Sequence, residues 1–391
     1  MAETRPIRAP EHKPGSPRAG PGWWLRSGLT PSGFPWPVLA VISGIVLVAQ
    51  IPLPHATAWH FFDEAADLLV GDERFGLYAA RPDLQFGPVS IAVALPFTAL
   101  GSLGSWAAML AFSAVGIWVV WLLMDSVRRL RPDLDQVAFA QTQLFAGVLF
   151  ILVWGDVAIR TAHIDDGITI AAAATAVWAI ARGRPWWVVV SLAVAGAAKP
   201  WGLIFAPLAA VLPGRYRWVR VALVFGLAAL TWAPFVIAES ATLDASSFEI
   251  ANEMSSSLRV LGVTAATTPD WVRPLQLVGG TAIAAALVWR GRWPAVLMAG
   301  VAFRLLIDPA ANRYYTVGFV LGLLVFELLR RPTYRPWLAV VAAAVLEFGQ
   351  VSWFPATLSG WIRLVVTVGA IVLAFATRPV SAAETSPLLR E

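Results

Sequence analysis

The 391-residue chain contains no cysteine, and only 14% of its residues are charged. The lack of cysteine excludes disulfides, thiolate metal sites and cysteine nucleophiles. A soluble globular domain carries about 25% charged residues, so the low charge content argues against a soluble fold. The sequence also lacks P-loop, GxSxG and HExxH patterns, and shows no GxGxxG in a strand–turn–helix context. These absences argue against soluble, nucleotide-driven chemistry.

Apolar residues dominate what remains. They make up 58% of the chain, and runs of membrane-spanning length recur from Trp36 to Arg378. This pattern predicts an all-α polytopic membrane protein with about 11–13 transmembrane helices over residues 36–378. Residues 1–35, rich in Pro, Gly and charge, are expected to be a disordered basic cytoplasmic tail. Residues 379–391 are expected to form a second cytoplasmic tail, and the first apolar run is expected to be retained because no signal-peptide cleavage pattern precedes it.

The arginines indicate how the chain is oriented. The formal net charge of +5 comes from short clusters between apolar runs, at positions 128–131, 182–184, 215–220, 290–292 and 330–335. This is the positive-inside pattern, and no basic stripe with interleaved aromatic residues suggests a nucleic-acid partner. All five clusters face the cytoplasm if segment 86–101 is a short re-entrant or surface helix. Its roughly sixteen residues are too few for an upright span, and Pro88 and Pro96 interrupt it.

This orientation predicts a multi-pass plasma-membrane protein with about twelve spans and its polar loops outside. The expected outer loops are residues 54–85, 155–167 and 239–273. The first contains 61-FFDEAADLLVGDERFGLY-78, which reads as an interfacial amphipathic helix with Phe61, Phe62, Ala65, Leu68 and Leu69 on its apolar face. That interpretation explains solvated acids such as Asp67. It explains Asp63 and Glu64 less well, because a carboxylate beside aromatic residues at a membrane edge can have a raised pKa and act as a base.

The second predicted loop contains 163-HIDDG-167 between two long apolar runs. One aspartate, Asp165 or Asp166, is expected to cap the helix that begins near Gly167, where negative charge is favoured. The other aspartate and His163 are not needed for helix capping. They indicate either contacts to substrate hydroxyls or, less well, a divalent cation, since H-x-D-D alone is a loose ligand pattern.

Two further segments bring cations to the predicted outer face. Lys199, in 199-KPW-201, is the only lysine after Lys13; it could snorkel to lipid headgroups or bind a phosphate. In 304-RLLIDPAANRYY-315, Arg304 and Arg313 could pair with Asp308 or grip a phosphate bidentately. We include Asp308 and Tyr314 among the expected substrate contacts.

The order of these motifs resembles a known family. From Trp36 to Leu329 the chain is similar to membrane glycosyltransferases of the GT-C superfamily, especially actinobacterial polyprenol-phosphate-mannose-dependent mannosyltransferases and their relatives. The motifs, in order, are 63-DEAADLLVG-71, 87-GP-88, 163-HIDDG-167, A-x-K-P-W at 197–201 and R-L-L-x-D-P-x-x-N-x-Y-Y at 304–315. The mannosyltransferases more often carry a tyrosine and two prolines after the first loop, where this chain has 86-FGP-88.

The resemblance implies a GT-C-like helical bundle and an enzyme that transfers mannose or another sugar from a polyprenyl-phosphate donor to a lipid or glycan acceptor of the cell envelope. It makes Asp63 the general base, with Glu64 assisting. It assigns Asp165 and Asp166 to orienting a sugar, and Lys199, Arg304 and Arg313 to the lipid phosphate. No cofactor is expected beyond a possible divalent cation. The alternatives are a transporter or flippase of a lipid-linked intermediate, whose charges should lie deeper in repeated halves, and an envelope scaffold protein.

Overall fold

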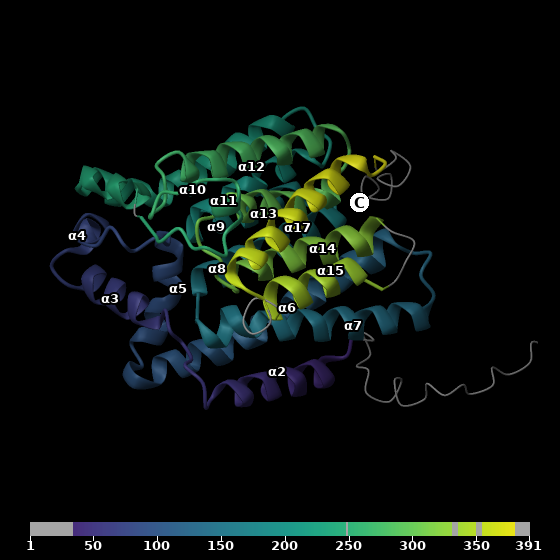
Figure 1. Cartoon of the computed structure of the whole chain (residues 1–391), viewed down its shortest axis with the longest axis horizontal. Helices are drawn as coiled ribbons and strands as arrows, with labels where there is room; N and C mark the ends of the chain where they lie inside the picture. The colour runs from purple at the N-terminus through teal and green to yellow at the C-terminus, as the bar shows by residue number, and fades with distance from the viewer. Residues whose placement is uncertain (1–33, 248, 331–334, 349–353, 380–391) are drawn as a thin grey trace, which may run out of the picture.

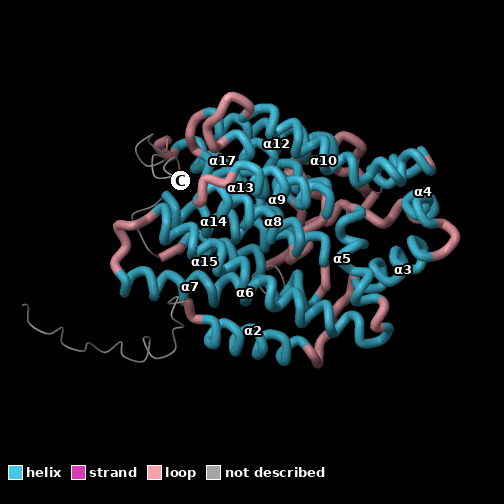
Figure 2. The backbone as a smooth tube through the Cα atoms, turned by 180° about the vertical axis from the view of Figure 1, so that it is seen from behind, coloured by secondary structure: helices cyan, strands magenta, loops and turns pink. Residues whose placement is uncertain are grey.

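The computed structural model describes residues 34–247, 249–330, 335–348 and 354–379. The predicted tails, 1–35 and 379–391, therefore fall almost wholly outside the described residues. Within those ranges the regular structure is helical, apart from an isolated antiparallel bridge between Ala251 and Thr267 (Figure 2). The predicted all-α class is confirmed.

Twelve helical segments of the described chain pass between the two ends of one bundle, and Figure 1 shows their axes lying side by side. In chain order they are α2 (Trp36–Gln50), α6 (Gly104–Leu130), α7 (Gln136–Gly155), α8 (Ile164–Ala181), α9 (Pro185–Ala198), the 3₁₀ helix η4 (Pro200–Ala210), α10 (Arg217–Ala238), α12 (Val272–Trp289), α13 (Val296–Leu306), α14 (Tyr315–Arg330), α15 (Trp337–Ala342) continued by η7 (Ala343–Phe348), and α17 (Ala356–Ala376). Six stretches, which contain α6, α7, α8, α10, α12 and α17, are long and apolar enough to cross a membrane by length and composition. The others are shorter, and together they support a multi-pass membrane protein.

The arginine clusters gather at one end of this bundle, which we call the basic end. Arg131, at the end of α6, donates to the carbonyl of Leu328 near the end of α14 (3.1 Å). Arg182, at the end of α8, donates to Asp125 of α6 (2.7 Å). The start of α10 reaches the same end, since its Trp218 stacks on Trp289 at the end of α12. The arginines therefore share one side, as the positive-inside pattern predicts.

The polar connections lie at the opposite end, which we call the loop end. Its segments are joined by backbone hydrogen bonds, from Ala56 to Ile159 and from Glu253 to Pro309 (2.9 Å each). The predicted loop 54–85 is largely helical here, with α3 (Trp59–Val70), η1 (Arg74–Gly76) and α4 (Leu77–Ala80). Predicted loop 239–273 contains η5 (Ser240–Ser247) and α11 (Ser257–Val260). The first-loop helices α3 and α4 lie together at one side of Figure 1, away from the C-terminus.

Helix α5 (Pro88–Thr98) begins and finishes at the loop end. At its start, the Gly87 N–H donates to the Ala198 carbonyl (2.7 Å), at the end of α9. After it, Gly104 opens α6 so close to Trp59 that an added Cβ would lie 3.3 Å from the Trp59 ring. With both ends on one side, α5 does not cross the bundle, in agreement with the prediction for segment 86–101.

The second predicted loop, 155–167, is wrong in extent. Helix α7 continues into the π-helical η3 (Asp156–Arg160), where the Thr161 N–H donates to the Asp156 carbonyl (3.0 Å). Helix α8 then starts at Ile164, so only residues 161–163 connect the two. Helices α7 and α8 both pack closely on α6 at glycines. An added Cβ on Gly116 of α6 would lie 2.4 Å from the Trp154 ring of α7, and one on Gly167 of α8 would lie 2.8 Å from the Phe112 ring of α6.

Candidate functional site

The start of α8 carries two buried aspartates. Asp165 and Asp166 lie in its first turn, and each residue is 1% exposed. His163 occupies the N-cap position, and no side chain caps the helix, so the predicted capping by an aspartate is wrong. Ala162 just before it has a left-handed φ of 51°, which costs an L-residue about 1–2 kcal/mol. Strain and a π-helical turn side by side are typical of functional sites.

Lys199 holds the two aspartates together. It caps the C-terminus of α9, and its Nζ lies 2.7 Å from Oδ2 of Asp166 and also contacts Oδ2 of Asp165. The remaining oxygens are paired as well. Trp201 Nε1 donates to Oδ1 of Asp166 (2.9 Å), and His163 Nδ1 lies 3.3 Å from Oδ1 of Asp165. All four carboxylate oxygens therefore have a partner, which is what two adjacent buried charges require.

Arg304, near the end of α13, extends this arrangement. Its guanidinium lies between two aromatic rings, 4.6 Å from the centre of Trp201 and 4.3 Å from that of Tyr315. It approaches Asp308 (3.7 Å) and Asp166 (4.0 Å), both beyond hydrogen-bond distance. Asp308 instead accepts hydrogen bonds from Gln276 (3.2 Å) and from the Ala310 N–H (3.0 Å). Arg304 is thus held by cation–π and charge contacts rather than by direct hydrogen bonds.

Tyr314 completes the group by stacking on His163 at 4.0 Å. The structure therefore joins seven of the predicted site residues in one network, which we call the buried charge cluster. Its members are His163, Asp165, Asp166, Lys199, Arg304, Asp308 and Tyr314.

Arg313 belongs to a neighbouring cluster. Its guanidinium lies 3.6 Å from Asp156 and 3.4 Å from Glu347, so the suggested pairing with Asp308 is wrong for Arg313 and holds only for Arg304. Asp156 opens η3 and Glu347 lies in η7, and both segments are π-helical. Thr316 also donates to Glu347. Two widened helical turns therefore each bring a buried carboxylate to one arginine.

Asp63 and Glu64 lie in α3, at the same end of the bundle. Burial, and after it the negative charge of Asp67, raises the pKa of Asp63 above its ordinary value. Glu64 instead pairs with Arg81, which also grips Asp83 through two hydrogen bonds (2.8 and 2.6 Å). Among the described residues, no hydrogen bond or ion pair joins either acid to the buried charge cluster. In the described part of the chain Asp63 has no ion pair, so it is the acid of this pair that no cation neutralises.

Helix α3 is nonetheless fixed against the cluster's surroundings. Phe62, next to Asp63, is buried and stacks on Phe86 at 4.5 Å. Gly87 and Ser90 then bond to the carbonyl of Ala198, the residue before Lys199 (2.7 and 2.9 Å). An added Cβ on Gly87 would lie 1.9 Å from the Ala197 carbonyl oxygen, so only glycine permits this approach.

The ligand set fits a divalent cation poorly. His163, Asp165 and Asp166 could each offer one atom, and these atoms lie within 4.8 Å of one another. The Lys199 ammonium, however, already bridges the two carboxylates. A metal ion placed there would meet that positive charge, so it would require Lys199 to move away first.

Several buried polar residues near the site escaped the sequence reasoning. They are Asp156, Trp201, Gln276, Tyr315, Glu347 and Arg363. A usable signal exists for three of them, since Asp156, Glu347 and Arg363 are ionisable residues within long apolar segments, and such residues seldom lack a purpose. Gln276 gives no comparable signal, because an isolated amide in a helix reads equally well as a surface residue.

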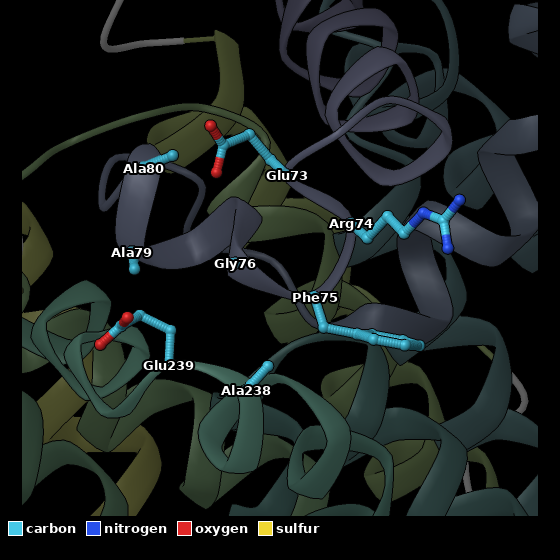
Figure 3. A pocket seen from close by; sticks show the side chains of 8 residues that line it. All are labelled: Glu73, Arg74, Phe75, Gly76, Ala79, Ala80, Ala238 and Glu239. Carbon is cyan, nitrogen blue, oxygen red and sulfur yellow. The ribbon is translucent and has the colours of Figure 1, made fainter.

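A surface cavity of about 470 Å³ lies elsewhere at the loop end, between the first-loop helices and the end of α10 (Figure 3). Glu73 and Arg74 line one side, and Glu239 lines the other. None of its lining residues belongs to the buried charge cluster or carries a predicted role. The cavity is therefore separate from the buried charge cluster.

Comparisons with known proteins add little to this geometry. No family model matches the chain, and no curated protein matches it. Among solved structures, the chain is similar to the crystal structure of ArnT from Cupriavidus metallidurans in the apo state. The two are 15% identical, the similarity covers 90% of this chain and 76% of that one, and the TM-score is 0.48. A likeness at this level says nothing about activity.

Proposed function

We propose that the protein is a membrane glycosyltransferase that moves a sugar from a polyprenyl-phosphate donor to a hydroxyl of a lipid or glycan acceptor. The carrying observation is the buried charge cluster, in which Asp165, Asp166 and Lys199 meet at the loop end. Ionisable groups in a membrane protein usually mark a substrate path or a reaction site. The order of the sequence motifs resembles that of GT-C enzymes, and this resemblance suggests sugar transfer as the reaction.

In this proposal Asp63 acts as the base. Its carboxylate takes the proton from the acceptor hydroxyl while that oxygen forms a bond to the anomeric carbon of the donor sugar. The bond between the anomeric carbon and the phosphate oxygen breaks, and its electron pair leaves with polyprenyl phosphate. A half-buried carboxylate with a raised pKa, as at Asp63, is a more effective proton acceptor than an ordinary aspartate.

The buried charge cluster would orient the sugars. Every carboxylate oxygen of Asp165 and Asp166 already has a partner in the protein. Sugar hydroxyls would therefore donate hydrogen bonds to the remaining lone pairs of these oxygens. Their fixed rotamers favour pre-organisation, which accounts for much of the rate in group transfer between bound partners. Since the phosphate is a competent leaving group, no nucleotide site is needed. Glu64, paired with Arg81, would hold the first loop in place.

The second candidate is a transporter or flippase for a lipid-linked intermediate. Such a protein would also need buried charges, which the two clusters supply. The position of both clusters at one end of the described bundle favours transfer at a surface over alternating access. A scaffold role would leave these buried charges without a function.

The deciding experiment uses purified protein in nanodiscs, radiolabelled polyprenyl-phosphate sugars and a membrane lipid extract as acceptor. We expect the label to appear on an acceptor while unlabelled polyprenyl phosphate is released. The counter-test uses proteoliposomes that carry the same donor in the inner leaflet of the bilayer. Movement of intact donor across the bilayer without a new glycosidic bond would support the transporter and contradict the transferase.

A further inference from the structure

Arg363 is a buried cation without hydrogen bonds. It lies in α17, its side chain is 0% exposed, and none of its three guanidinium nitrogens has a hydrogen-bond partner among the described residues. Arginine keeps its proton in proteins, so its five N–H donors stay unsatisfied. Leaving such donors without acceptors in a protein interior is strongly unfavourable. The side chains that the structure describes therefore do not account for this residue.

Arg220 shows what a satisfied buried arginine looks like in the same protein. It lies at the basic end, is 6% exposed and donates to the carbonyls of Leu212 and Pro213. Those contacts close the turn before α10 and give the residue a structural role. Within the described part of the chain, Arg363 has no comparable hydrogen bonds.

Two more unsatisfied polar atoms lie where α11 packs on α17. Ser257 Oγ and Ser359 Oγ are both buried, and neither has a hydrogen-bond partner in the described ranges. The residues next to them, Ser256 and Gly360, are in close contact: an added Cβ on Gly360 would lie 3.0 Å from the Ser256 carbonyl oxygen. Buried groups of this kind are rare in native proteins, so several near one contact indicate that a polar ligand group belongs there.

The groups that act electrostatically on Arg363 are, in order of strength, Asp308, Tyr315, Glu253 and Arg304. Asp308 balances charge at a distance but directs its oxygens to Gln276 and the Ala310 N–H. Arg304 likewise retains donors, because its two acidic contacts exceed hydrogen-bond distance. Two guanidiniums with free donors match a ligand that carries several anionic oxygens.

We propose that Arg363 binds the phosphate of the polyprenyl-phosphate lipid, with Arg304 as the second cation. This inference rests on the proposed function, which supplies the lipid. It replaces Lys199 as the principal phosphate ligand, since the Lys199 ammonium is already shared between Asp165 and Asp166. It also predicts that the released lipid, a phosphomonoester with more negative charge than the donor diester, binds at least as tightly as the donor.

The test compares thermal unfolding of delipidated protein in phosphatidylcholine nanodiscs with and without polyprenyl phosphate. Uncharged polyprenol, inorganic phosphate and phosphatidylglycerol are the comparison ligands. The variants are Arg363→Met, which removes the charge at similar length, Arg363→Lys, and Arg220→Gln as the matched control. We expect polyprenyl phosphate to stabilise wild type and Arg220→Gln, with at least tenfold weaker affinity in Arg363→Met and an intermediate value in Arg363→Lys.

The ligand-free proteins give a second readout that a purely structural arginine would not produce. Because Arg363 has no partner in the described fold, Arg363→Met should unfold at the wild-type temperature or above it. A variant that misfolds, or unfolds well below wild type, would show that Arg363 has a structural partner and would overturn the inference. An unchanged affinity for polyprenyl phosphate in Arg363→Met would overturn it too. Equal stabilisation by inorganic phosphate or phosphatidylglycerol would contradict the assignment of the site to polyprenyl phosphate.

Failure of the proposed function is distinguishable from failure of this inference. If wild type transfers no sugar but binds polyprenyl phosphate through Arg363, the transferase proposal fails and the phosphate site stands. If wild type transfers sugar and Arg363→Met keeps its affinity, the phosphate site fails and the transferase proposal stands.

Discussion

The ammonium of Lys199 lies 2.7 Å from a carboxylate oxygen of Asp166, and the same ammonium also contacts Asp165. Three charges that the sequence scatters over 35 residues are thus one buried unit. The pairing changes what a substitution at Lys199 should do. The lysine is a counter-ion of the site before it is a contact for any ligand.

We first predict that Lys199→Met destabilises the protein by about 3–5 kcal/mol, because removing one partner of a buried ion pair leaves an uncompensated charge. Thermal unfolding in detergent measures the loss. The double variant Lys199→Met/Asp166→Asn should recover part of it, since the second change removes one stranded carboxylate. Equal stability of wild type and Lys199→Met would contradict the pairing.

The second prediction concerns the base. Asp63→Asn should reduce sugar transfer by roughly a hundredfold or more, the usual effect of losing general base catalysis, while donor affinity and stability stay near wild type. Glu64→Gln should instead loosen the first loop, because Glu64 pairs with Arg81. Initial rates, donor titration and thermal unfolding separate these effects. Full activity in Asp63→Asn would refute the assignment.

The third prediction is a shift in pH dependence. A base must be ionised to act, so transfer should fall as pH drops through the pKa of Asp63, which burial and Asp67 hold above its ordinary value. Asp67→Asn removes one cause of the raised pKa, so the acidic limb of kcat/KM should move to lower pH. Asp72→Asn, an exposed acid that does not act on Asp63, is the matched control. The same limb in all three proteins would contradict this prediction.

The fourth prediction concerns the join between the first loop and α9. Gly87→Ala would force the two segments apart, because the new Cβ would lie 1.9 Å from the Ala197 carbonyl oxygen. We expect transfer to fall roughly a hundredfold, as a displacement of about 1 Å can cause. Gly76→Ala is the control, since its Cβ would lie 3.5 Å from Glu73 and meet no backbone. Comparable rates for the two variants would show that the join is not needed.

The last prediction concerns orientation. The protein has no native cysteine, so single cysteines report without background. Cysteines at the exposed positions Thr57 and Asp72 should react with an impermeant thiol reagent in intact cells. Cysteines at Asp133 and Arg184, exposed at the basic end, should react only after lysis. The reverse pattern would place the candidate site on the cytoplasmic side.

Much of the fold was predictable because long apolar runs and arginine clusters are local signals. Segment 86–101 is the clearest case, since its length and prolines sufficed to exclude a span. The residues of the buried charge cluster were predictable in part. His163, Asp165, Asp166 and Lys199 each stood out as charge beside apolar sequence, but nothing local says that Lys199 folds back onto both aspartates.

The remaining errors have a common physical origin. The extent of loop 155–167 was wrong because Asp156 and the other polar residues there were read as a connection, whereas the backbone continues as a π-helix. Arg313 and Asp308 lie close in sequence, but the partners of Arg313 come from η3 and η7, far away along the chain. Packing of distant elements decides such pairs, and no motif spacing records it.

The two π-helical segments that bring Asp156 and Glu347 to Arg313 also make this end of the bundle sensitive to chain length. A π turn holds an extra residue, and deleting one would let the helix return to ordinary α geometry. A π turn and an α turn direct their side chains differently, so this change would redirect the carboxylate and withdraw it from Arg313. Insertions and deletions here should therefore be tolerated less well than substitutions, a constraint that side-chain chemistry alone would not impose.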